Sequence, residues 1–502
     1  MSLDAPSSEE GRRPTHDDSI FASVGARRVN PKHQRRLSAY ATRDLTSGGI
    51  KSTLWFLAWP QMVGGVFNAT DQLADLFWAG MLGGFHAIAG VGVAQTYAHL
   101  MMMARQGLDV GMQALIARAV GVQRLDLANH AALQAFTLVI VISIVMVTGG
   151  VLLARPLLSI LGTSDDVIAA TSMFLQYQFV SAGVQAFRQT AGAVLQASGD
   201  TLTNMKSTMA SRILHLALSP VFIFGWLGLP EMGLAGAAMA NIVAQAAGAV
   251  WNLYALFSGA SRIHLSLKGY YVDLRLMWRI LRIGGPASVT QMERGVSELV
   301  LVRLVTPFGD LALAAYSLTR RLERLTNIGS QGVGRASGIL AGQNLGAGKP
   351  ERARATVRWA VSYVMLIRGL AGLLLIIFPA FFVSIFSEER EFVETAVIWI
   401  QIQAVAGIAL GAGQVFQQSF NIAGDTVAPM LVTFMSMWVM EIPLAFVLTR
   451  FSPLDELGIP VAIAIAMFFR FALYGGYYLT GRWLRVGVLE PTESASAEGA
   501  QR

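Results

Sequence analysis

Long apolar runs dominate this chain between residues 52 and 484, and each is long enough to cross a membrane. Hydrophobic residues make up 54% of the 502 positions and charged residues 14%, and the mean hydropathy is +0.52. About 20 apolar residues span a bilayer, and a spanning backbone must satisfy its own hydrogen bonds. The sequence therefore predicts an all-α membrane protein with twelve transmembrane helices, at 52–82, 86–119, 128–157, 165–196, 203–227, 233–257, 279–307, 310–344, 353–386, 392–421, 427–450 and 457–484.

The second half of the chain repeats the first at an offset of 225 residues. Gly199-Asp200-Thr201 returns as Gly424-Asp425-Thr426, and Gly107 and Gly121 recur as Gly332 and Gly346. Two apolar halves in the same order are typical of transporters with two membrane bundles and a substrate path between them. The repeat predicts two six-helix bundles related by internal duplication, and we interpret Asp200 and Asp425 as capping or bracing groups at surface turns.

Lys and Arg are concentrated before the first span and after the even-numbered spans. Such an excess marks cytoplasmic segments, so we expect a multi-pass protein of the plasma membrane with both termini in the cytoplasm. The expected parts are a disordered basic N-terminal tail (1–50), an N-lobe with spans one to six (51–260), a cytoplasmic inter-lobe linker (261–278), a C-lobe with spans seven to twelve (279–485) and a disordered cytoplasmic tail (486–502).

Other classes of protein are disfavoured by composition. The basic N-terminal segment also carries six acidic residues and lacks interleaved aromatic residues, so membrane lipids rather than nucleic acid are its expected neighbours. Residues 1–48 lack the apolar core of a signal peptide. The chain has no cysteine, which excludes disulfides, thiolate chemistry and cysteine-based metal sites.

Two carboxylates lie one helical turn apart within the first span, at Asp71 and Asp75. Ionisable groups in a membrane are costly and usually serve a function. Two carboxylates on one helical face do not both ionise easily in a poorly solvated cavity, so we expect one of them to hold a proton near neutral pH. The alternative is a structural pair bonded to neighbouring spans, with Asn68 and Gln72 nearby.

Several motifs resemble the multidrug and toxic compound extrusion (MATE) family. They are GQNLGAGKPERA at 342–353, LQASGDT at 195–201 and DLFWAG at 75–80, and the resemblance runs from about residue 50 to 485. It implies a monomeric secondary antiporter that exports small organic, often cationic, compounds in exchange for protons or sodium. Asp75 lies fifteen residues after Pro60, where the family carries the N-lobe aspartate tied to cation coupling.

The N-half departs from the family pattern at several polar positions. Asp71 is an additional acid, and His215 and Ser219 stand where many relatives have Asn and then Asp or Asn. A relay in which Asp71 and His215 replace the missing acid and simple hydrogen-bonded packing of His215 both remain open. Asn241 stands at the family's usual Thr position. The resemblance thus predicts Asp75 as a coupling residue, and the departures from the family pattern add Asp71 and His215. Asn68, Gln72, Ser219 and Asn241 are the expected polar lining of the cavity.

The C-half carries a different set of charges, which form a second candidate site: Glu293, Arg294, Glu298 and Glu441. Arg294 and Glu298 are four residues apart and can neutralise each other. Glu441 precedes Pro443 by two positions and either contacts a substrate cation or meets an arginine such as Arg294. A sodium site of the family's C-half type is disfavoured, because Arg294 occupies the place of its glutamate and Gly411 that of its companion acid.

The predicted function is therefore proton-coupled export of organic compounds by alternating access, with no cofactor and no bound metal apart from a sodium ion that Asp75 is able to accept. Sodium-coupled drug efflux and flipping of lipid-linked saccharides are alternatives within the same architecture. An intramembrane enzyme is disfavoured, since no HExxH, nucleophile-plus-base or phosphate-loop motif is present.

Overall fold

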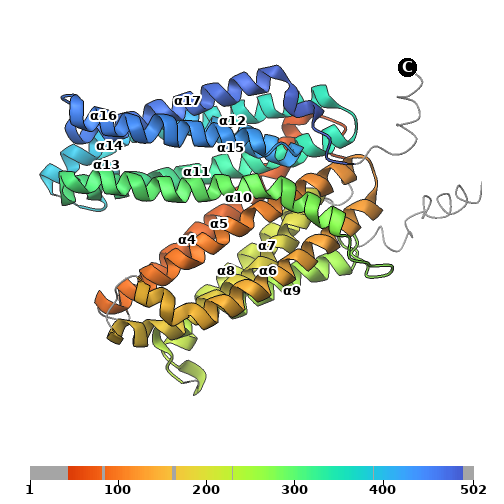
Figure 1. Ribbon diagram of the computed structural model, residues 1–502, viewed down its shortest axis with the longest axis horizontal. Coiled ribbons are helices and arrows are strands. Elements are labelled where there is room, and N and C mark those ends of the chain that lie inside the picture. The colour runs from red at the N-terminus through yellow and green to blue at the C-terminus, as the bar shows by residue number, and fades with distance from the viewer. Residues whose placement is uncertain (1–42, 82–84, 161–164, 229, 388, 490–502) are drawn as a thin grey trace, which may run out of the picture.

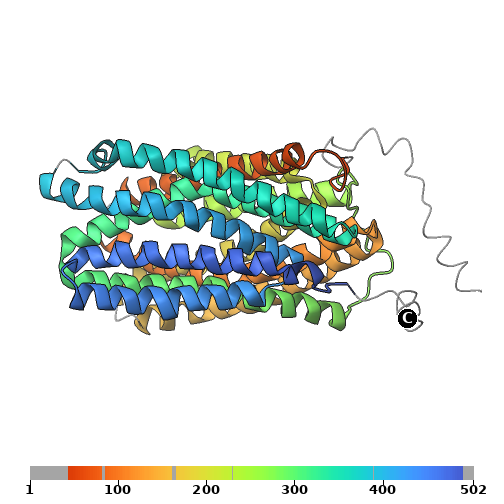
Figure 2. The same ribbon diagram turned by 90° about the horizontal axis from the view of Figure 1, so that it is seen from above.

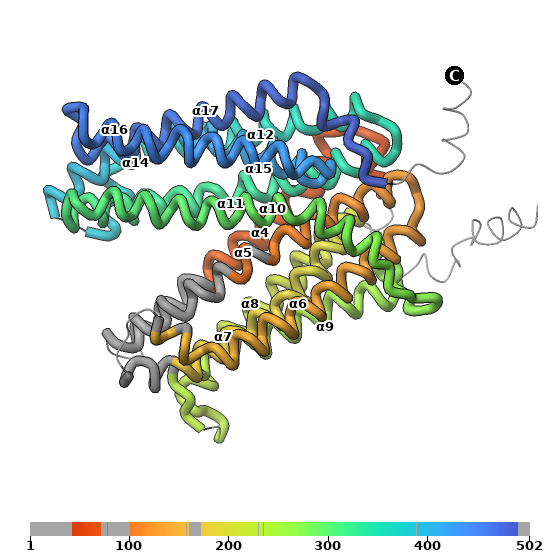
Figure 3. The backbone as a smooth tube through the Cα atoms, in the orientation of Figure 1, coloured from red at the N-terminus to blue at the C-terminus, as the bar shows by residue number. Residues whose placement is uncertain are grey.

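The computed structural model describes residues 43–81, 85–160, 165–228, 230–387 and 389–489, and the described chain is helical over most of its length (Figures 1 and 3). Within the helices the backbone alone is described for 72–77, 79–81, 85–100, 165–171 and a few single residues. The predicted tails at 1–42 and 490–502 lie outside the described residues.

The first half of the chain forms six long helices, which we call the N-lobe. They are α4 (Ile50–Met81), α5 (Phe85–Gly121), α6 (Leu125–Ile160), α7 (Asp165–Ser198), α8 (Thr201–Ile223) and α9 (Gly233–Phe257), with a short turn of 3₁₀-helix, η1 (Trp226–Gly228), after α8. Asp200 caps α8, because its Oδ1 accepts the backbone N–H of Thr203 at 3.1 Å, which confirms the interpretation of this residue.

The second half forms the C-lobe. It contains α10 (Leu274–Val305), η2 (Thr306–Phe308), α11 (Asp310–Gly346), α12 (Pro350–Ile377), α13 (Pro379–Ser384), α14 (Arg390–Ala423), α15 (Val427–Phe434), the π-helical segment η3 (Met435–Glu441), α16 (Ile442–Phe451), η4 (Asp455–Leu457), α17 (Gly458–Thr480) and η5 (Arg482–Arg485). Spans nine and eleven are each divided, at Phe378 and at η3, and counting each as one span gives the twelve predicted spans. The fold prediction is confirmed.

Five of the described helical segments are long and apolar enough by themselves to cross a membrane: Leu125–Pro156, Pro350–Ile377, Arg390–Ala423, Val427–Phe451 and Asp455–Thr480. Helix α11 illustrates why others fall short, since it carries several arginines among small residues. Charges of this kind in a membrane helix normally face the interior of a bundle rather than lipid. The less apolar helices are therefore the ones to search for function.

The two lobes meet at one end of the molecule and diverge toward the other (Figure 1). Their helices run roughly along the long axis of the molecule when viewed from above (Figure 2). Helices α5 and α10 pack together across the interface, as do α4 and α11. We call the end at which residues 258–273 join the lobes the linker end, and the opposite end the divergent end.

Glycines let the two backbones touch near the linker end. A Cβ atom on Gly107 of α5 would collide with the carbonyl oxygen of Gly284 in α10. A Cβ on Gly121 would likewise strike the carbonyl oxygen of Gln343 in α11. Small residues at such crossings allow membrane helices to approach closely. The repeated glycines of the sequence thus lie where the lobes are in contact.

Both chain ends of the described region also bind at the linker end. The Arg118 guanidinium donates to the carbonyl oxygens of Ala423 at 2.9 Å and Val486 at 3.2 Å, and the Lys349 ammonium donates to Thr46 at 2.9 Å. Leu45 is fully buried. The prediction that disorder extends to residue 50 and begins again at 486 is therefore wrong at its inner edges, because residues 43–49 and 486–489 are packed against the lobes.

Candidate functional site

A buried carboxylate on α4, Asp71, binds two basic side chains of α8. Its Oδ2 accepts a hydrogen bond from the Arg212 guanidinium at 2.6 Å, and its Oδ1 lies 2.7 Å from the Nδ1 of His215. Arg212 and His215 are three residues apart, so they lie on one face of α8. Asp71 is 6% exposed and His215 2% exposed. The sequence prediction that Asp71 and His215 belong to one site fits this arrangement.

Two of the predicted polar residues surround this cluster. The Asn68 side-chain oxygen accepts from the Nε of Arg212 at 2.9 Å, so Asn68 positions the arginine. The Ser219 hydroxyl donates to the carbonyl oxygen of His215 at 2.7 Å within its own helix. Ser219 is only 1% exposed in this structure, and its place in a cavity wall stays a prediction.

Arg212 was not predicted as a site residue, and it changes the expected charge of the two acids. The expectation that Asp71 and Asp75 are neighbouring carboxylates without a cation is wrong for Asp71, because the Arg212 guanidinium pairs with it directly. The missed signal was spacing, since an arginine three residues before His215 shares its helix face.

The remaining residues of the predicted pair lie partly outside the description. Asp75 is in α4, one turn beyond Asp71, and Gln72 is in the same helix, but their side chains lie outside the described residues. The role of Asp75 in coupling stays a prediction.

A second polar network lies deeper in the N-lobe, around Arg188 of α7. This arginine is 5% exposed and donates to Gln245 at 2.5 Å and to Thr208 at 3.2 Å. Gln245 in turn donates to the Asn241 side-chain oxygen at 3.2 Å. Asn241, predicted as cavity lining, is thus joined to a buried arginine that the sequence analysis missed.

A third N-lobe pair faces the interface with the C-lobe. Arg105 and Asp109 of α5 form an ion pair at 3.1 Å, and the Thr190 hydroxyl donates to Asp109 at 2.9 Å. Near this pair, the Gln291 amide of α10 donates to the Gln106 side-chain oxygen across the interface at 2.6 Å. Of these contacts, the hydrogen bond between Gln106 and Gln291 joins the two lobes, and none of these residues was predicted as a site residue.

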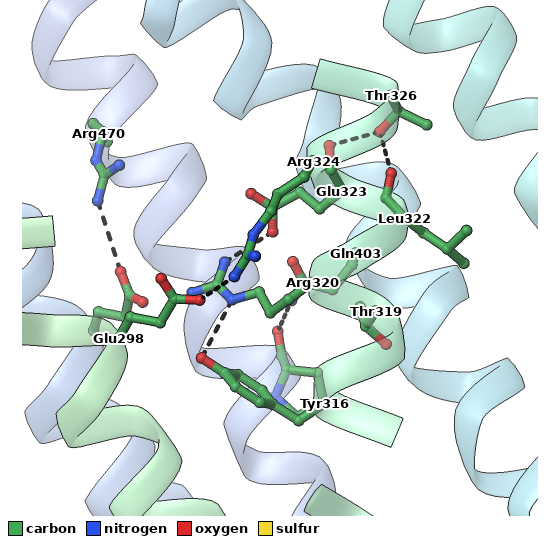
Figure 4. A network of polar contacts seen from close by, with 12 residues as sticks. Glu298, Tyr316, Thr319, Arg320, Leu322, Glu323, Arg324, Thr326, Gln403 and Arg470 are labelled. Carbon is green, nitrogen blue, oxygen red and sulfur yellow. Dashed lines mark hydrogen bonds and ion pairs between the residues drawn. The ribbon is translucent and has the colours of Figure 1, made fainter. Parts of the chain in front are cut away.

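The C-lobe charges form a network on α10, α11, η3 and α17, and Figure 4 shows its residues on α10, α11 and α17. Arg320 lies between Glu323, at 2.8 Å, and the Tyr316 hydroxyl, at 3.3 Å. Arg324 donates to Glu298 at 2.7 Å. Most of these charges therefore balance within the lobe.

One predicted pairing in this network is wrong, because Glu298 pairs with Arg324 of α11 rather than with Arg294. The arginine that Glu441 meets is Arg470 of α17, at 3.7 Å, and not Arg294, while contact of Glu441 with a substrate cation stays a prediction. In both cases a helix distant in sequence brings a better-placed arginine. Arg294 instead donates to the Gln417 side chain at 2.5 Å, and the Oε2 of Glu293 has no hydrogen-bond partner within the described structure.

The packing around Gly411 bears on a sodium site of the kind found in the C-half of some relatives. A Cβ atom at Gly411 would lie 2.9 Å from the Cγ of Arg368. Arg368 itself donates to the carbonyl oxygen of Gly407 at 2.8 Å. The aliphatic part of the Arg368 side chain thus fills the space next to position 411, and the expectation that a sodium site of this type is disfavoured stays a prediction. Within the described chain, no cluster of His, Asp and Glu has the arrangement needed to hold a metal ion.

The π-helical segment η3 positions Glu441. It ends at Glu441, two residues before Pro443, which has no N–H to donate and therefore interrupts the regular hydrogen bonding. The Arg470 Nε donates to Ser436, in the same segment, at 2.7 Å. Departures of this type in membrane helices commonly mark functional positions.

The sequence profile of the MatE family matches this chain twice, over residues 60–221 and 286–447. The chain belongs to the MATE family. The two matches are offset by 226 residues, 286 minus 60, within one position of the repeat found in the sequence, which confirms the internal duplication. As a MATE protein the chain is a multi-pass membrane transporter and not an enzyme.

Bacterial relatives match this MATE protein over most of its length. The probable multidrug resistance protein YoeA of Bacillus subtilis is 24% identical, covering 84% of this chain and 91% of the relative. The probable multidrug resistance protein NorM of Thermotoga maritima is 25% identical, covering 88% and 94%. A solved structure described as the outward-facing conformation of a multidrug resistance MATE family transporter superposes with a TM-score of 0.82 at 19% identity, over 90% of this chain and 100% of that one. The structural likeness establishes the fold.

Proposed function

We propose that this MATE protein is a secondary antiporter that exports small organic compounds of the multidrug type across the plasma membrane while protons move inward. The observation that carries the proposal is the buried cluster in which Asp71 binds both Arg212 and His215. The names of the relatives support the substrate type. Cationic substrates, implied by the family resemblance, remain a prediction.

The cluster has the chemistry of a proton switch. Arg212 and the Asp71 carboxylate balance each other, so with a neutral His215 the cluster carries no net charge. A histidine exchanges protons near physiological pH, and a proton on His215 adds an uncompensated charge to a buried site, which is costly. Protonation thus favours a conformation that opens the cluster to water or to a further acid such as Asp75, which lies one turn away.

Helix α4 connects this switch to the lobe interface. It packs on α8, which carries Arg212 and His215, and also on α11 of the C-lobe. Gly65 of α4 lies directly against Ile328 of α11, and Met62 lies against Gly332. A shift of α4 that follows protonation of the cluster would displace its contacts with α11, which lie within a few helical turns of Asp71. Rocking of the two lobes requires such a displacement.

We further propose that the linker end is cytoplasmic. The excess of basic residues in the segments at this end, Arg262, Lys268 and Arg275 among them, supports this orientation. The lobes touch at this end (Figure 1), so the structure then corresponds to a state that is closed toward the cytoplasm.

Proteoliposomes with an imposed pH or sodium gradient test the proposal. We expect the pH gradient to drive efflux of a fluorescent drug such as ethidium from wild-type vesicles, and Asp71→Asn and His215→Gln to lose this drive. The double variant Asp71→Asn/Arg212→Gln removes both charges of the pair, so it controls for folding while still lacking the switch. Full pH-driven efflux in the folded double variant would overturn the proposed site.

The same vesicles separate the sodium alternative. Transport driven by sodium and lost in Glu293→Gln, with Asp71→Asn unaffected, would place coupling in the C-lobe. Loss in Asp75→Asn with sodium as the driving ion would assign sodium rather than protons to the N-lobe.

A further inference from the structure

One face of α11 carries a row of exposed polar side chains along the lobe interface. Arg321, Arg324, Gln331 and Arg335 are all exposed, and their spacing of three, seven and four residues places them on one side of the helix. Ile328 lies between them on this side and touches Gly65 of α4. The row therefore faces the N-lobe rather than the lipid.

Arg335 is the residue of this row that lies nearest the linker end. It lies eleven residues before the end of α11 at Gly346, about 16 Å along the helix from the linker end. Its side chain is exposed. Three residues away on either side, Gly332 packs against Met62 of α4 and Gly338 against Gln418 of α14, so Arg335 borders solvent where α11 meets the N-lobe.

Arg335 has no carboxylate of its own in the described part of the protein. The charge that acts on it is Asp109, which lies across the interface on α5. Asp109 already forms an ion pair with Arg105 at 3.1 Å and accepts the Thr190 hydroxyl. Asp109 is thus already engaged, and no ion pair within the described residues balances the charge of Arg335.

Other arginines of the C-lobe interior have ion-pair or hydrogen-bond partners. Arg320 has Glu323 and Arg470 has Glu441. Arg368 donates to the Gly407 carbonyl oxygen and to the Thr326 hydroxyl. Arg294 has no carboxylate partner either, but it donates to Gln417, whereas Arg335 has no ion pair within the described residues and is exposed to solvent.

We propose that Arg335, with Gln331 one turn away, binds an acidic group of the transported compound, either a carboxylate or a phosphate. A guanidinium binds such groups through two parallel charge-assisted hydrogen bonds. The substrate anion supplies the partner that Asp109, already paired with Arg105, does not provide. The proposal rests on the proposed export function, because it assigns the substrate class of the same interlobe path.

Equilibrium binding tests this assignment without any ion gradient. The probes are 1-naphthoate, 1-naphthyl phosphate and the neutral isostere 1-naphthamide, titrated into the purified full-length protein in detergent. We expect the acids to bind more tightly than the amide. Arg335→Gln should weaken acid binding about tenfold to a hundredfold, the usual contribution of a hydrogen-bonded charge, and leave the amide unchanged.

Two further variants make the result specific. Arg335→Lys keeps the charge but loses the paired donors, so it should retain part of the preference for acids. Arg358→Gln removes an exposed arginine of α12 outside the row and should change nothing. A preference for acids that survives in folded Arg335→Gln protein would overturn the proposal.

A lipid source of the acidic group is distinguished in vesicles that contain fluorescent phosphatidic acid. Movement of this lipid between leaflets that depends on Arg335, without binding of either naphthyl acid, would assign the acidic group to a lipid headgroup. Absence of Arg335 dependence for all three acids would overturn the proposal. If acids bind through Arg335 but Asp71→Asn leaves pH-driven transport intact, the proposed proton coupling at Asp71 is wrong and the acid site stands. If a pH gradient still drives transport of the amide and the protein shows no preference for acids, the acid site is wrong and the proposed export function stands.

Discussion

At the scale of single residues, a buried charge in this protein is defined by its partner more than by its own identity. Asp71 alone would be a costly group in a membrane bundle, but Arg212 and His215 of α8 make it the centre of a neutral cluster. The same rule holds in the C-lobe, where Glu441 has Arg470. Removing one partner of such a pair is more disruptive than removing both.

Arg212→Gln should therefore destabilise the protein strongly, by about 3 to 5 kcal/mol, because it leaves the Asp71 carboxylate buried without its guanidinium. Arg212→Gln combined with Asp71→Asn should recover most of the loss. Thermal unfolding of the detergent-solubilised protein, followed by size-exclusion chromatography, measures both. Equal melting temperatures for single and double variants would show that the ion pair does not hold α4 to α8.

Asp273 gives a pH-dependent contribution outside the membrane. It caps α10: its Oδ1 accepts the Leu276 N–H at 3.0 Å, and this hydrogen bond, together with one from His130, lowers the pKa of its carboxyl below the ordinary value. A lowered pKa stabilises the folded state above the ordinary pKa of Asp, and the contribution disappears as the pH falls through the lowered value.

The stability of the wild type relative to Asp273→Asn should accordingly be greatest near neutral pH and diminish below about pH 4. Asn is itself a good cap, so the comparison isolates the charge, whereas Asp273→Ala should lose about 1 kcal/mol at neutral pH. Melting temperatures of the three proteins across pH test this, and a pH-independent difference between wild type and Asp273→Asn would contradict it.

At the scale of helices, glycines determine how closely the lobes approach. Gly107 and Gly284 face each other with no room for a Cβ on either, and Gly121 contacts the Gln343 backbone. Such contacts are made in one conformation and broken in the other when lobes rock. The glycines of the linker end are therefore part of the conformational equilibrium and not only of folding.

Gly107→Ala should shift the population away from the state closed at the linker end, because its methyl group would collide with the Gly284 carbonyl oxygen. The natural chain has no cysteine, so a single cysteine at Ala197, near the Gln343 amide, reports accessibility by its rate of alkylation. We expect faster alkylation in Gly107→Ala than in the background. Gly369→Ala, on α12 with open space around its Cβ, is the control and should leave the rate unchanged.

The helices and the repeat could be predicted from the sequence because apolar length and glycine spacing are local properties. The partners of buried charges could not, because they depend on which helices pack together. Arg294 and Glu298 lie one turn apart on α10, yet Glu298 pairs with Arg324 of α11. The sequence grouped Asp71 with His215 only because both residues depart from the family pattern.

At the scale of the whole molecule, the duplication supplies two similar lobes and the charges make them unequal. The N-lobe holds the cluster of Asp71, Arg212 and His215, whereas the C-lobe presents Arg335 on the face turned toward it. Helix α4 lies between the two, packed on α8 and on α11. The proposed coupling site and the proposed substrate site are thus separate, and α4 is the helix that connects them.

Spin labels at the divergent end should report this communication. Leu227, after α8, and Phe451, at the end of α16, are both highly exposed and belong to different lobes, so a cysteine at each can be labelled without disturbing packing. Lowering the pH from 8 to about 5.5, across the range in which histidine titrates, should increase the population with a shorter distance between the labels, because protonation favours closure of the divergent end. Electron–electron double resonance measures the distribution. The response to pH should be absent in Asp71→Asn/Arg212→Gln. It should be retained in Arg335→Gln, because this variant alters substrate binding and not the proton switch. A pH response that persists in Asp71→Asn/Arg212→Gln would show that lobe movement does not depend on the cluster of α4 and α8.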